Sequence, residues 1–212
     1  MKPRLKAYIQ IYVAVILFSL TAILGDLIQL DAVILVWWRV FITSISLLFF
    51  VRFGKDIIAL PRHVILKFIG IGAIVALHWI CFYAAIKLAN ASIALVALAT
   101  TTFFTALLEP LLNKTKIKPL QLILSLAIIP GMALVVSDLN LTMITGLLVG
   151  LVSAFFASTF ATLNKKYFDL AGTFEITFLE IFGACLSISI ILPFYAAFAE
   201  WQFMPSPQDW VY

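Results

Sequence analysis

Two ionisable side chains, Arg39 and Glu180, lie inside long apolar runs of this sequence. An unpaired charge in hydrocarbon costs about 2.5–3.5 kcal/mol even on mild scales, so each group should face protein, water or a ligand. Arg39 is suited to bind a carboxylate or phosphate, and Glu180 could carry a coupling proton. The structural alternatives stay open: an arginine satisfied by carbonyl groups, and a carboxyl group buried against hydroxyls or water.

Aromatic and polar residues of the third and fourth apolar runs extend this set. His78 could relay protons or simply hydrogen-bond a neighbouring helix. Trp79, Tyr83 and Lys87 share one helical face, which would line a cavity for a flat or cationic solute or face lipid with Lys87 snorkelling. Thr101 belongs to a small and polar seam whose simpler role is tight packing. The candidate substrate-binding residues are Arg39, Trp38, His78, Trp79, Tyr83, Thr101 and Glu180.

Seven apolar segments must position these residues. A helix that crosses a bilayer needs roughly 20 mostly apolar residues, and the chain is 64% apolar and only 11% charged. The sequence therefore predicts an all-α, polytopic bundle of transmembrane helices. The predicted spans are Ala7–Gly25, Ala32–Val51, Val64–Leu88, Ala91–Leu112, Leu120–Val136, Thr145–Leu163 and Phe174–Phe198.

The basic residues between the spans fall almost entirely on one side. They are Lys2, Arg4, Lys6, Arg52, Lys55, Arg62, Lys114, Lys116, Lys118, Lys165 and Lys166. The alternate loops carry Asp26, Asp31, Asp138, Glu200 and Asp209, with Lys87 as the basic exception. Because basic loops are retained in the cytoplasm, the N-terminus is predicted to be cytoplasmic and Tyr212 external. The net charge of +4 then reflects topology and indicates no nucleic-acid partner.

Several other function classes lack their signature residues. Cys81 and Cys185 lie inside spans and indicate neither a disulfide nor a metal site, and no cofactor is expected. No P-loop of the G-x-x-x-x-G-K-[ST] form is present. The ionisable residues of the spans are single and scattered, which argues against an enzyme. A retinal protein would need a lysine deep in a late span, and spans four to seven have none.

Small residues and prolines mark helix contacts and kinks. A stripe at four-residue spacing predicts close contact of the sixth span with another helix. Pro130 with Gly131, and Pro193, predict kinks in the fifth and seventh spans. The stripe consists of Gly146, Gly150, Ala154, Ser158 and Thr162.

The second and seventh spans carry similar stripes. Arg39, Thr43 and Ser46 have the same i, i+4, i+7 spacing as Glu180, Ala184 and Ser187. If span seven is a second copy of span two, the repeat is five spans long, so the second copy enters the membrane inverted. The boundary would lie near residues 137–141, which gives a first repeat over 1–137 and the start of a second over 142–212. Arg39 and Glu180 would then lie at levels roughly 9 Å apart along the membrane normal.

Three segments resemble the EamA-type drug/metabolite transporters. They are the run His-Trp-Ile-Cys-Phe-Tyr-Ala-Ala-Ile-Lys-Leu-Ala-Asn-Ala-Ser at 78–92, the Leu-Glu-Pro-Leu-Leu that ends the fourth span before a basic loop, and the Trp38-Arg39 pair. The likeness extends from about Ala7 to Tyr212. It implies two inverted five-helix repeats and the export of amino acids, other metabolites or drugs by alternating access.

This resemblance implies ten helices, of which the chain would contain about seven, with a complete first repeat and a truncated second. Trp210 and Tyr212 would then be interfacial aromatics at the start of an eighth span. The leading expectation is a secondary transporter in a bacterial-type inner membrane, with a small-molecule substrate and lipid as partners. Proton coupling and a homodimer stay open. The alternative is a truncated, non-transporting protein or a helper subunit completed by another chain.

Overall fold

The computed structural model describes residues 3–51, 56–136, 140–198 and 202–209, and every regular element in these ranges is helical. The predicted all-α helix bundle is confirmed. In chain order the elements are α1 (Pro3–Leu27), α2 (Ala32–Leu47), α3 (Arg62–Leu88), α4 (Ala91–Ala99), α5 (Thr101–Asn113), α6 (Pro119–Leu126), α7 (Ile128–Val136), α8 (Leu141–Tyr167), a 3-10 turn η2 (Phe168–Leu170) and α9 (Thr173–Phe198). Some residues named above lie outside the described ones: Lys2, Arg52, Lys55, Asp138, Glu200, Trp210 and Tyr212, together with positions 137–139 of the predicted repeat boundary.

In the part of the chain that the structure describes, five helical segments are long and apolar enough to cross a membrane. They are Tyr8–Leu27, Arg62–Leu88, Ala91–Asn113, Leu141–Leu170 and Thr173–Phe198. Two further apolar segments, Ala32–Leu47 and Pro119–Met132, are shorter than the other five. They correspond to the second and fifth predicted spans.

The second predicted span, Ala32–Val51, extends past Leu47, the last residue of α2. Helix α2 has 16 residues, about 24 Å at 1.5 Å per residue, which falls short of a hydrocarbon core of about 30 Å. After Leu47 the amides of Leu48 and Phe49 donate to carbonyl oxygens three residues earlier, at 3.2 and 3.3 Å. The chain thus leaves the α-helix through tight turns although its residues stay apolar, which the hydropathy of the sequence could not indicate.

The fourth predicted span forms as two helices, α4 and α5, that meet at Thr100. Three consecutive threonine hydroxyls donate to carbonyl oxygens three residues earlier, from Thr100 at 2.6 Å, Thr101 at 2.5 Å and Thr102 at 3.1 Å. Such side-chain bonds compete with the helical backbone pattern and bend helices. The break therefore follows from the local run of threonines.

The fifth predicted span is likewise divided, into α6 and α7 at Ala127. Pro130 has no amide to donate to the carbonyl of Leu126, and its ring crowds that carbonyl. The predicted kink at Pro130 is thus expressed one turn earlier. Pro193, by contrast, lies inside the continuous helix α9.

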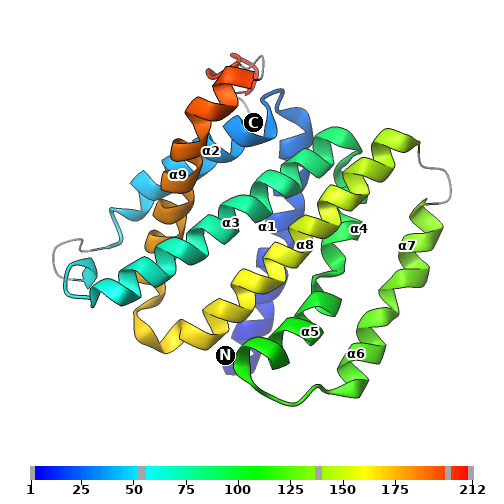
Figure 1. Cartoon of the computed structure of the whole chain (residues 1–212), viewed down its shortest axis with the longest axis horizontal. Coiled ribbons are helices and arrows are strands. Elements are labelled where there is room, and N and C mark those ends of the chain that lie inside the picture. Colours follow the sequence, from blue (N-terminus) through cyan, green and yellow to red (C-terminus); the bar gives the residue numbers. More distant parts are fainter. Residues whose placement is uncertain (1–2, 52–55, 137–139, 199–201, 210–212) are drawn as a thin grey trace.

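Helix α3 lies at the centre of the bundle, between α8 and α9 (Figure 1). Glycines allow the close crossings on both sides. A Cβ atom added to Gly72 would meet the backbone of α9, including the nitrogen of Ala184 at 2.9 Å, and one added to Gly146 of α8 would lie 3.1 Å from the carbonyl oxygen of Ala85 in α3. The residues of the predicted stripe on α8 are all buried, so its close helix contact is confirmed.

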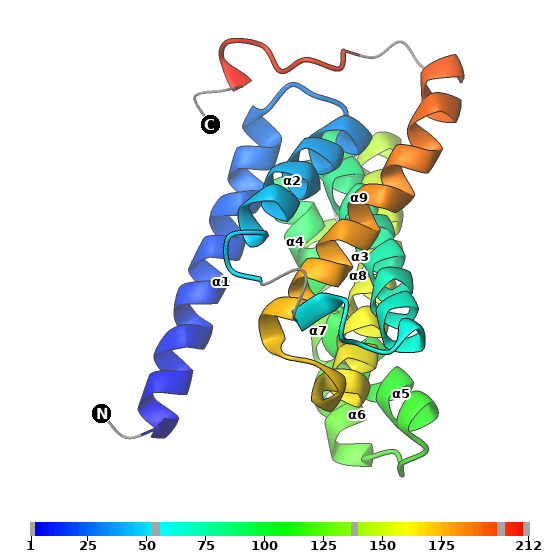
Figure 2. The same ribbon diagram turned by 90° about the vertical axis from the view of Figure 1, so that its left-hand side faces the viewer.

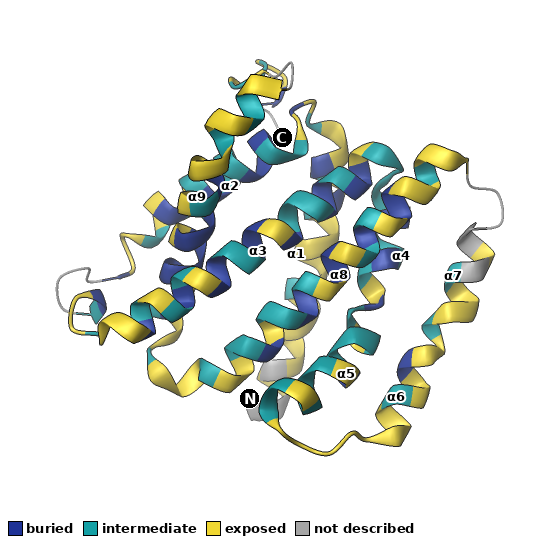
Figure 3. Ribbon diagram, viewed as in Figure 1, coloured by how far each residue is buried: buried dark blue, intermediate teal, exposed yellow. Residues whose placement is uncertain are grey.

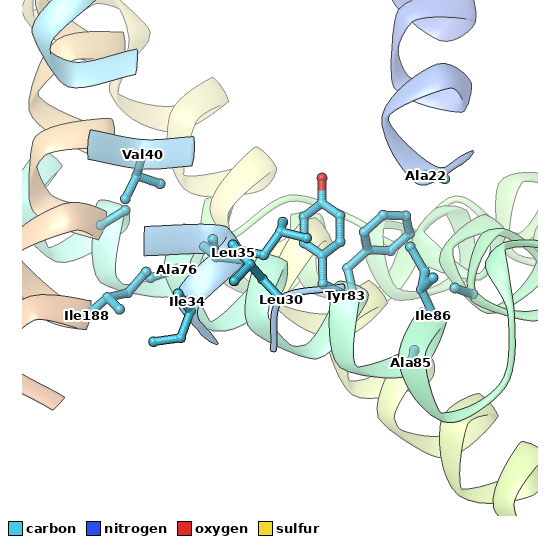
Figure 4. Packing of buried hydrophobic residues seen from close by; sticks show 14 of the residues in the cluster. Ala22, Leu30, Ile34, Leu35, Val40, Ala76, Tyr83, Ala85, Ile86 and Ile188 are labelled. Atoms are coloured by element: carbon cyan, nitrogen blue, oxygen red, sulfur yellow. The ribbon is translucent and has the colours of Figure 1, made fainter. Parts of the chain in front are cut away.

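Helix α1 packs at one side of the bundle, against α3 and α4 (Figure 2). Its large apolar side chains, among them Ile16 and Phe18, are exposed. Figure 3 colours much of α1 as exposed. A bilayer would cover this surface. The main core instead surrounds the C-terminal half of α3, where Tyr83 lies among Ala22, Leu35 and Ile86 (Figure 4).

The two ends of the bundle differ in charge. The start of α1, the loop between α5 and α6 and the end of α8 lie at one end, and the loop between α1 and α2 and residues 202–209 lie at the other (Figures 1 and 2). We call the first the basic end, since it carries Lys6, Lys114, Lys116, Lys118, Lys165 and Lys166, and the second the acidic end, since it carries Asp26, Asp31 and Asp209.

Candidate functional site

A cavity of about 510 Å³ lies inside the bundle, between α1, α2, α3, α4, α5, α8 and α9. We call it the central cavity. Apolar side chains such as Val75, Phe82 and Leu95 form most of its wall. The predicted candidates Arg39, His78, Trp79, Thr101 and Glu180 also line it. Residues that are as far apart in sequence as Arg39 and Glu180 thus meet around one space.

A second cavity of about 370 Å³ lies nearer the acidic end and shares Arg39 and Thr21 with the first. We call it the outer cavity. Trp38 and Tyr83, the two remaining candidates, line it. The indole nitrogen of Trp38 donates to the carbonyl oxygen of Phe203 at 2.8 Å. The seven predicted residues therefore surround two cavities that adjoin at Arg39.

Arg39 is held by two aromatic rings of α3. Its Nη1 donates a hydrogen bond to the hydroxyl of Tyr83, and its Cζ lies 4.7 Å from the ring centroid of Trp79 and 5.7 Å from that of Tyr83. Cation–π contacts of this kind contribute roughly 0.5–2 kcal/mol. Within the described part of the chain no carboxylate forms an ion pair with Arg39. The guanidinium is thus oriented while its positive charge stays available to an anionic group.

His78 is fixed by a reciprocal contact with α8. Its Nδ1 lies 3.0 Å from the carbonyl oxygen of Ser153, and the Ser153 hydroxyl donates to the carbonyl oxygen of His78 at 3.0 Å. The consistent tautomer therefore has the proton on Nδ1, with Nε2 as the acceptor. His78 thus performs the interhelical bonding that the sequence offered as its simpler role, while its ring also lines the central cavity.

Glu180 lies on α9 toward the basic half of the central cavity and is only 8% exposed. Its Oε2 accepts a hydrogen bond from the amide nitrogen of Asn164 at 3.1 Å. Its Oε1 and the Oδ1 of Asn164 are buried and have no hydrogen-bond partner in the structure. No ion pair joins Glu180 to Arg39 within the described residues. A proton or a cationic group would supply the donor that Oε1 lacks.

The ring of Tyr83 does not face lipid. Tyr83 is 2% exposed, so the lipid-facing alternative offered for this face of α3 is wrong at that position. Lys87, one turn further on, donates to the carbonyl oxygen of Ile28 in the loop after α1. Tertiary contacts with α1 and α2 cover a face that the sequence alone left open.

Residues 202–209 form a strap across the acidic end (Figure 2). Asp209 accepts hydrogen bonds from the backbone amides of Gln29, at 2.9 Å, and Ser206, at 2.8 Å. The bond from Gln29, together with those from Ser206 and the charge of Lys87, holds the pKa of Asp209 below its ordinary value. Pro205 and Asp209 also line the outer cavity, so the strap forms part of its wall.

Replacing Asp209 by alanine is expected to loosen the strap and speed hydrogen exchange of the Gln29 amide roughly tenfold, the factor for losing one hydrogen bond to a charged group. The strap's contribution to stability should be complete above the unfolded pKa of about 3.9 and lost as the pH falls through the lower folded pKa. Hydrogen exchange of the Gln29 amide, measured by mass spectrometry across this pH range, checks both the faster exchange and its pH dependence. Asp31→Ala is the control. Asp31 lies in the same loop as Gln29, and its carboxylate accepts no hydrogen bond from the first amides of α2. Equal exchange in both variants would contradict the role of Asp209.

The opposite end is joined by contacts between α5 and α8. Lys165 forms an ion pair with Glu109, and Lys166 donates to the carbonyl oxygen of Leu112 at 2.7 Å. An exposed pair of this kind contributes at most about 1 kcal/mol. It can therefore hold two helices together at the basic end without locking them.

Four residues that line these cavities or bind their lining residues were not among the predicted candidate site residues. Thr21 lines both cavities, Ser153 and Asn164 bind His78 and Glu180, and Asp209 fixes the strap. Asn164 carried a detectable signal, since it is an amide in the last turns of an apolar helix. Ser153 carried none, because its only distinction is a partner 75 positions away.

Within the described residues, no group of three or more His, Cys, Asp or Glu side chains could hold a metal ion.

No curated protein and no solved structure matches the chain. The model of the EamA-like transporter family matches residues 5–137. This match is more than half of the chain and extends from the first turn of α1 to the end of α7, so it includes Arg39, His78, Trp79 and Tyr83. The chain therefore belongs to the EamA-like transporter family.

Proposed function

We propose that this membrane protein is a secondary transporter that exports a small organic solute bearing a carboxylate, such as an amino acid or another metabolite, by alternating access. The observation that carries the proposal is the central cavity. Arg39, which forms no ion pair with any described residue, lies at its outer side, and the partly unsatisfied Glu180 lies at its inner side. The carboxylate of the solute would accept hydrogen bonds from Arg39. The apolar wall would contact the rest of the molecule.

The orientation that we propose places the basic end in the cytoplasm, since short loops rich in lysine and arginine stay on that side. The strap then lies on the external side and the Lys165–Glu109 contact on the cytoplasmic side. Alternating access would require each closure to open in turn. The polar contacts at the two ends are a few hydrogen bonds and one exposed ion pair, which are weak enough to exchange.

We assign the alternating-access movement to an inverted repeat in which α9 is the counterpart of α2. The two helices pack side by side and run in opposite directions (Figures 1 and 2). This arrangement supports the symmetry expected from their polar stripes, with the solute site between the halves. The helix breaks at Thr100 and Ala127 are positions at which such a bundle can bend.

Transport in liposomes reconstituted with the protein tests the proposal. The panel would contain radiolabelled amino acids and small carboxylic acids, with the cationic dye ethidium for comparison. Concentrative movement of one or more carboxylate solutes, absent from protein-free liposomes, is the expected result. Movement of ethidium alone would argue against a carboxylate-binding role for Arg39.

We further propose that a proton carried by Glu180 drives the transport. Replacing Glu180 by glutamine is then expected to lower pH-gradient-driven transport at least tenfold while sparing solute exchange across the same membrane. Glutamine keeps the shape of the side chain and an acceptor for Asn164 but cannot carry a proton. Driven transport and counterflow in the same liposomes separate the two effects. Glu175→Gln, in the first turn of the same helix, is the matched control. Loss of exchange as well as driven transport would make Glu180 a structural residue.

A further inference from the structure

A third space, of about 620 Å³, lies between α5 and α6. One wall carries Thr101, Thr102 and Thr105 of α5, and the other carries Leu120 and Leu124 of α6. Both leucines are exposed. We call this space the α5–α6 groove, and most of the surface that it offers is apolar.

The groove continues at the basic end into a smaller pocket of about 140 Å³, with which it shares Thr105, Lys118 and Gln121. Lys116 and Thr115 also line this pocket. The space between α5 and α6 therefore has an apolar part within the bundle and a polar part at its basic end. A ligand that fills both must be amphipathic.

The charge around the smaller pocket is positive. Lys114, Lys116 and Lys118 lie in one short exposed loop. Glu109 is the acidic residue among those that line the pocket, and it is already paired with Lys165. The first turn of α6 contains no acidic side chain, so nothing there offsets the positive helix end. The polar part of the site thus favours an anionic head group.

We infer that the α5–α6 groove binds one anionic phospholipid from the leaflet at the basic end. The phosphate would lie in the smaller pocket beside Lys116, Lys118 and the hydroxyl of Thr115. An acyl chain would run inward against Leu120 and Leu124. Basic pockets between transmembrane helices are recognised sites for anionic lipid head groups, and the bilayer presents such lipids to this face at high local concentration.

The consequence reaches the central cavity through Thr101, whose side chain lines both spaces. Thr101 is also the first residue after the break between α4 and α5. A lipid in the groove would brace α5 against α6 at the point where the longer span can bend. Thr101 thus belongs both to the lipid site and to the central cavity. Lipid binding does not, however, depend on solute binding.

Native mass spectrometry of the delipidated full chain, mixed with equal amounts of phosphatidylglycerol and phosphatidylcholine, tests this inference. We expect a single phosphatidylglycerol adduct. The Lys116→Gln/Lys118→Gln variant should bind it roughly 30-fold more weakly, the factor expected for removing two lysines from an anionic surface. Leu124→Trp, which keeps every charge and fills the apolar part, should also lower retention.

The matched control is Lys6→Gln/Arg62→Gln, which removes two exposed positive charges at the starts of α1 and α3. The starts of these helices lie away from α5 and α6 (Figures 1 and 2). It should retain the adduct. Four results would overturn the inference: equal binding of the two lipids, equal loss in the control, full retention in Leu124→Trp, or a lipid-free dimer in place of the adduct. All substituted residues are exposed, and circular dichroism of each variant verifies its helix content. The measurement needs no transport, so it separates failure of this inference from failure of the proposed function.

Discussion

Arg39→Ala is expected to weaken solute binding by at least roughly 30-fold, since truncating one partner of a buried charge pair costs about 2 kcal/mol or more. The guanidinium is oriented by Trp79 and Tyr83 and has no carboxylate partner within the described residues. Its charge is therefore free to pair with the solute. Binding of the carboxylate solute identified in liposomes, measured by calorimetry on the purified protein, checks this expectation.

Tyr83→Phe provides the comparison for Arg39. It removes the hydroxyl that accepts the Arg39 hydrogen bond but keeps the ring beside the guanidinium. We expect a loss of roughly tenfold, smaller than in Arg39→Ala, since a hydrogen bond to a charged group contributes about 1.5–3 kcal/mol while the guanidinium charge and its cation–π contact persist. Unchanged binding in Arg39→Ala, with the helix content retained, would make Arg39 a structural residue.

Gly72→Ala is expected to destabilise the fold by roughly 1–3 kcal/mol, the range for an overpacked core. The added Cβ would lie against the carbonyl oxygen of Glu180 and 2.9 Å from the nitrogen of Ala184. Both are backbone atoms of α9, so they cannot move aside as the end of a flexible side chain can. The helices must separate, and Glu180 would shift with them. pH-gradient-driven transport should therefore fall together with stability.

Gly70→Ala on the same helix is the control, because a Cβ at that position has nothing within 4 Å. Alanine is the better helix former by about 1 kcal/mol, so this variant should be as stable as the parent or slightly more stable. Unfolding of both variants in detergent, followed by circular dichroism, gives the comparison. Equal stability of Gly72→Ala and Gly70→Ala would mean that α3 and α9 do not pack as closely as the structure has them.

The helical class and the approximate spans could be predicted from the sequence because both depend on local properties. The length of an apolar run and the charges that flank it are read directly along the chain. The small-residue stripe on α8 was equally readable, since residues four apart share one helical face. The prediction that Arg39 and Glu180 would lie in protein or water, away from lipid, followed from the cost of an unpaired charge in hydrocarbon.

The predictions from apolar length alone were wrong where local polar bonds or backbone geometry override hydropathy. Helix α2 ends at Leu47 although the next residues are apolar. The threonines at 100–102 and the proline at 130 divide two further spans. These departures involve single hydrogen bonds, which a window of about 20 residues averages away.

By itself, then, the sequence determined that this chain forms apolar helices with charged ends and that a few polar side chains need partners within the bundle. Only the tertiary structure decided which partners they have. Tyr83 lies 44 positions from Arg39, and Ser153 lies 75 positions from His78. The physical reason is that such pairs depend on how helices cross, and the crossings depend on glycines such as Gly72 meeting backbone atoms far away in sequence. The spacing of residues along the sequence indicates which face of a helix is buried, but it does not indicate which other helix packs against that face.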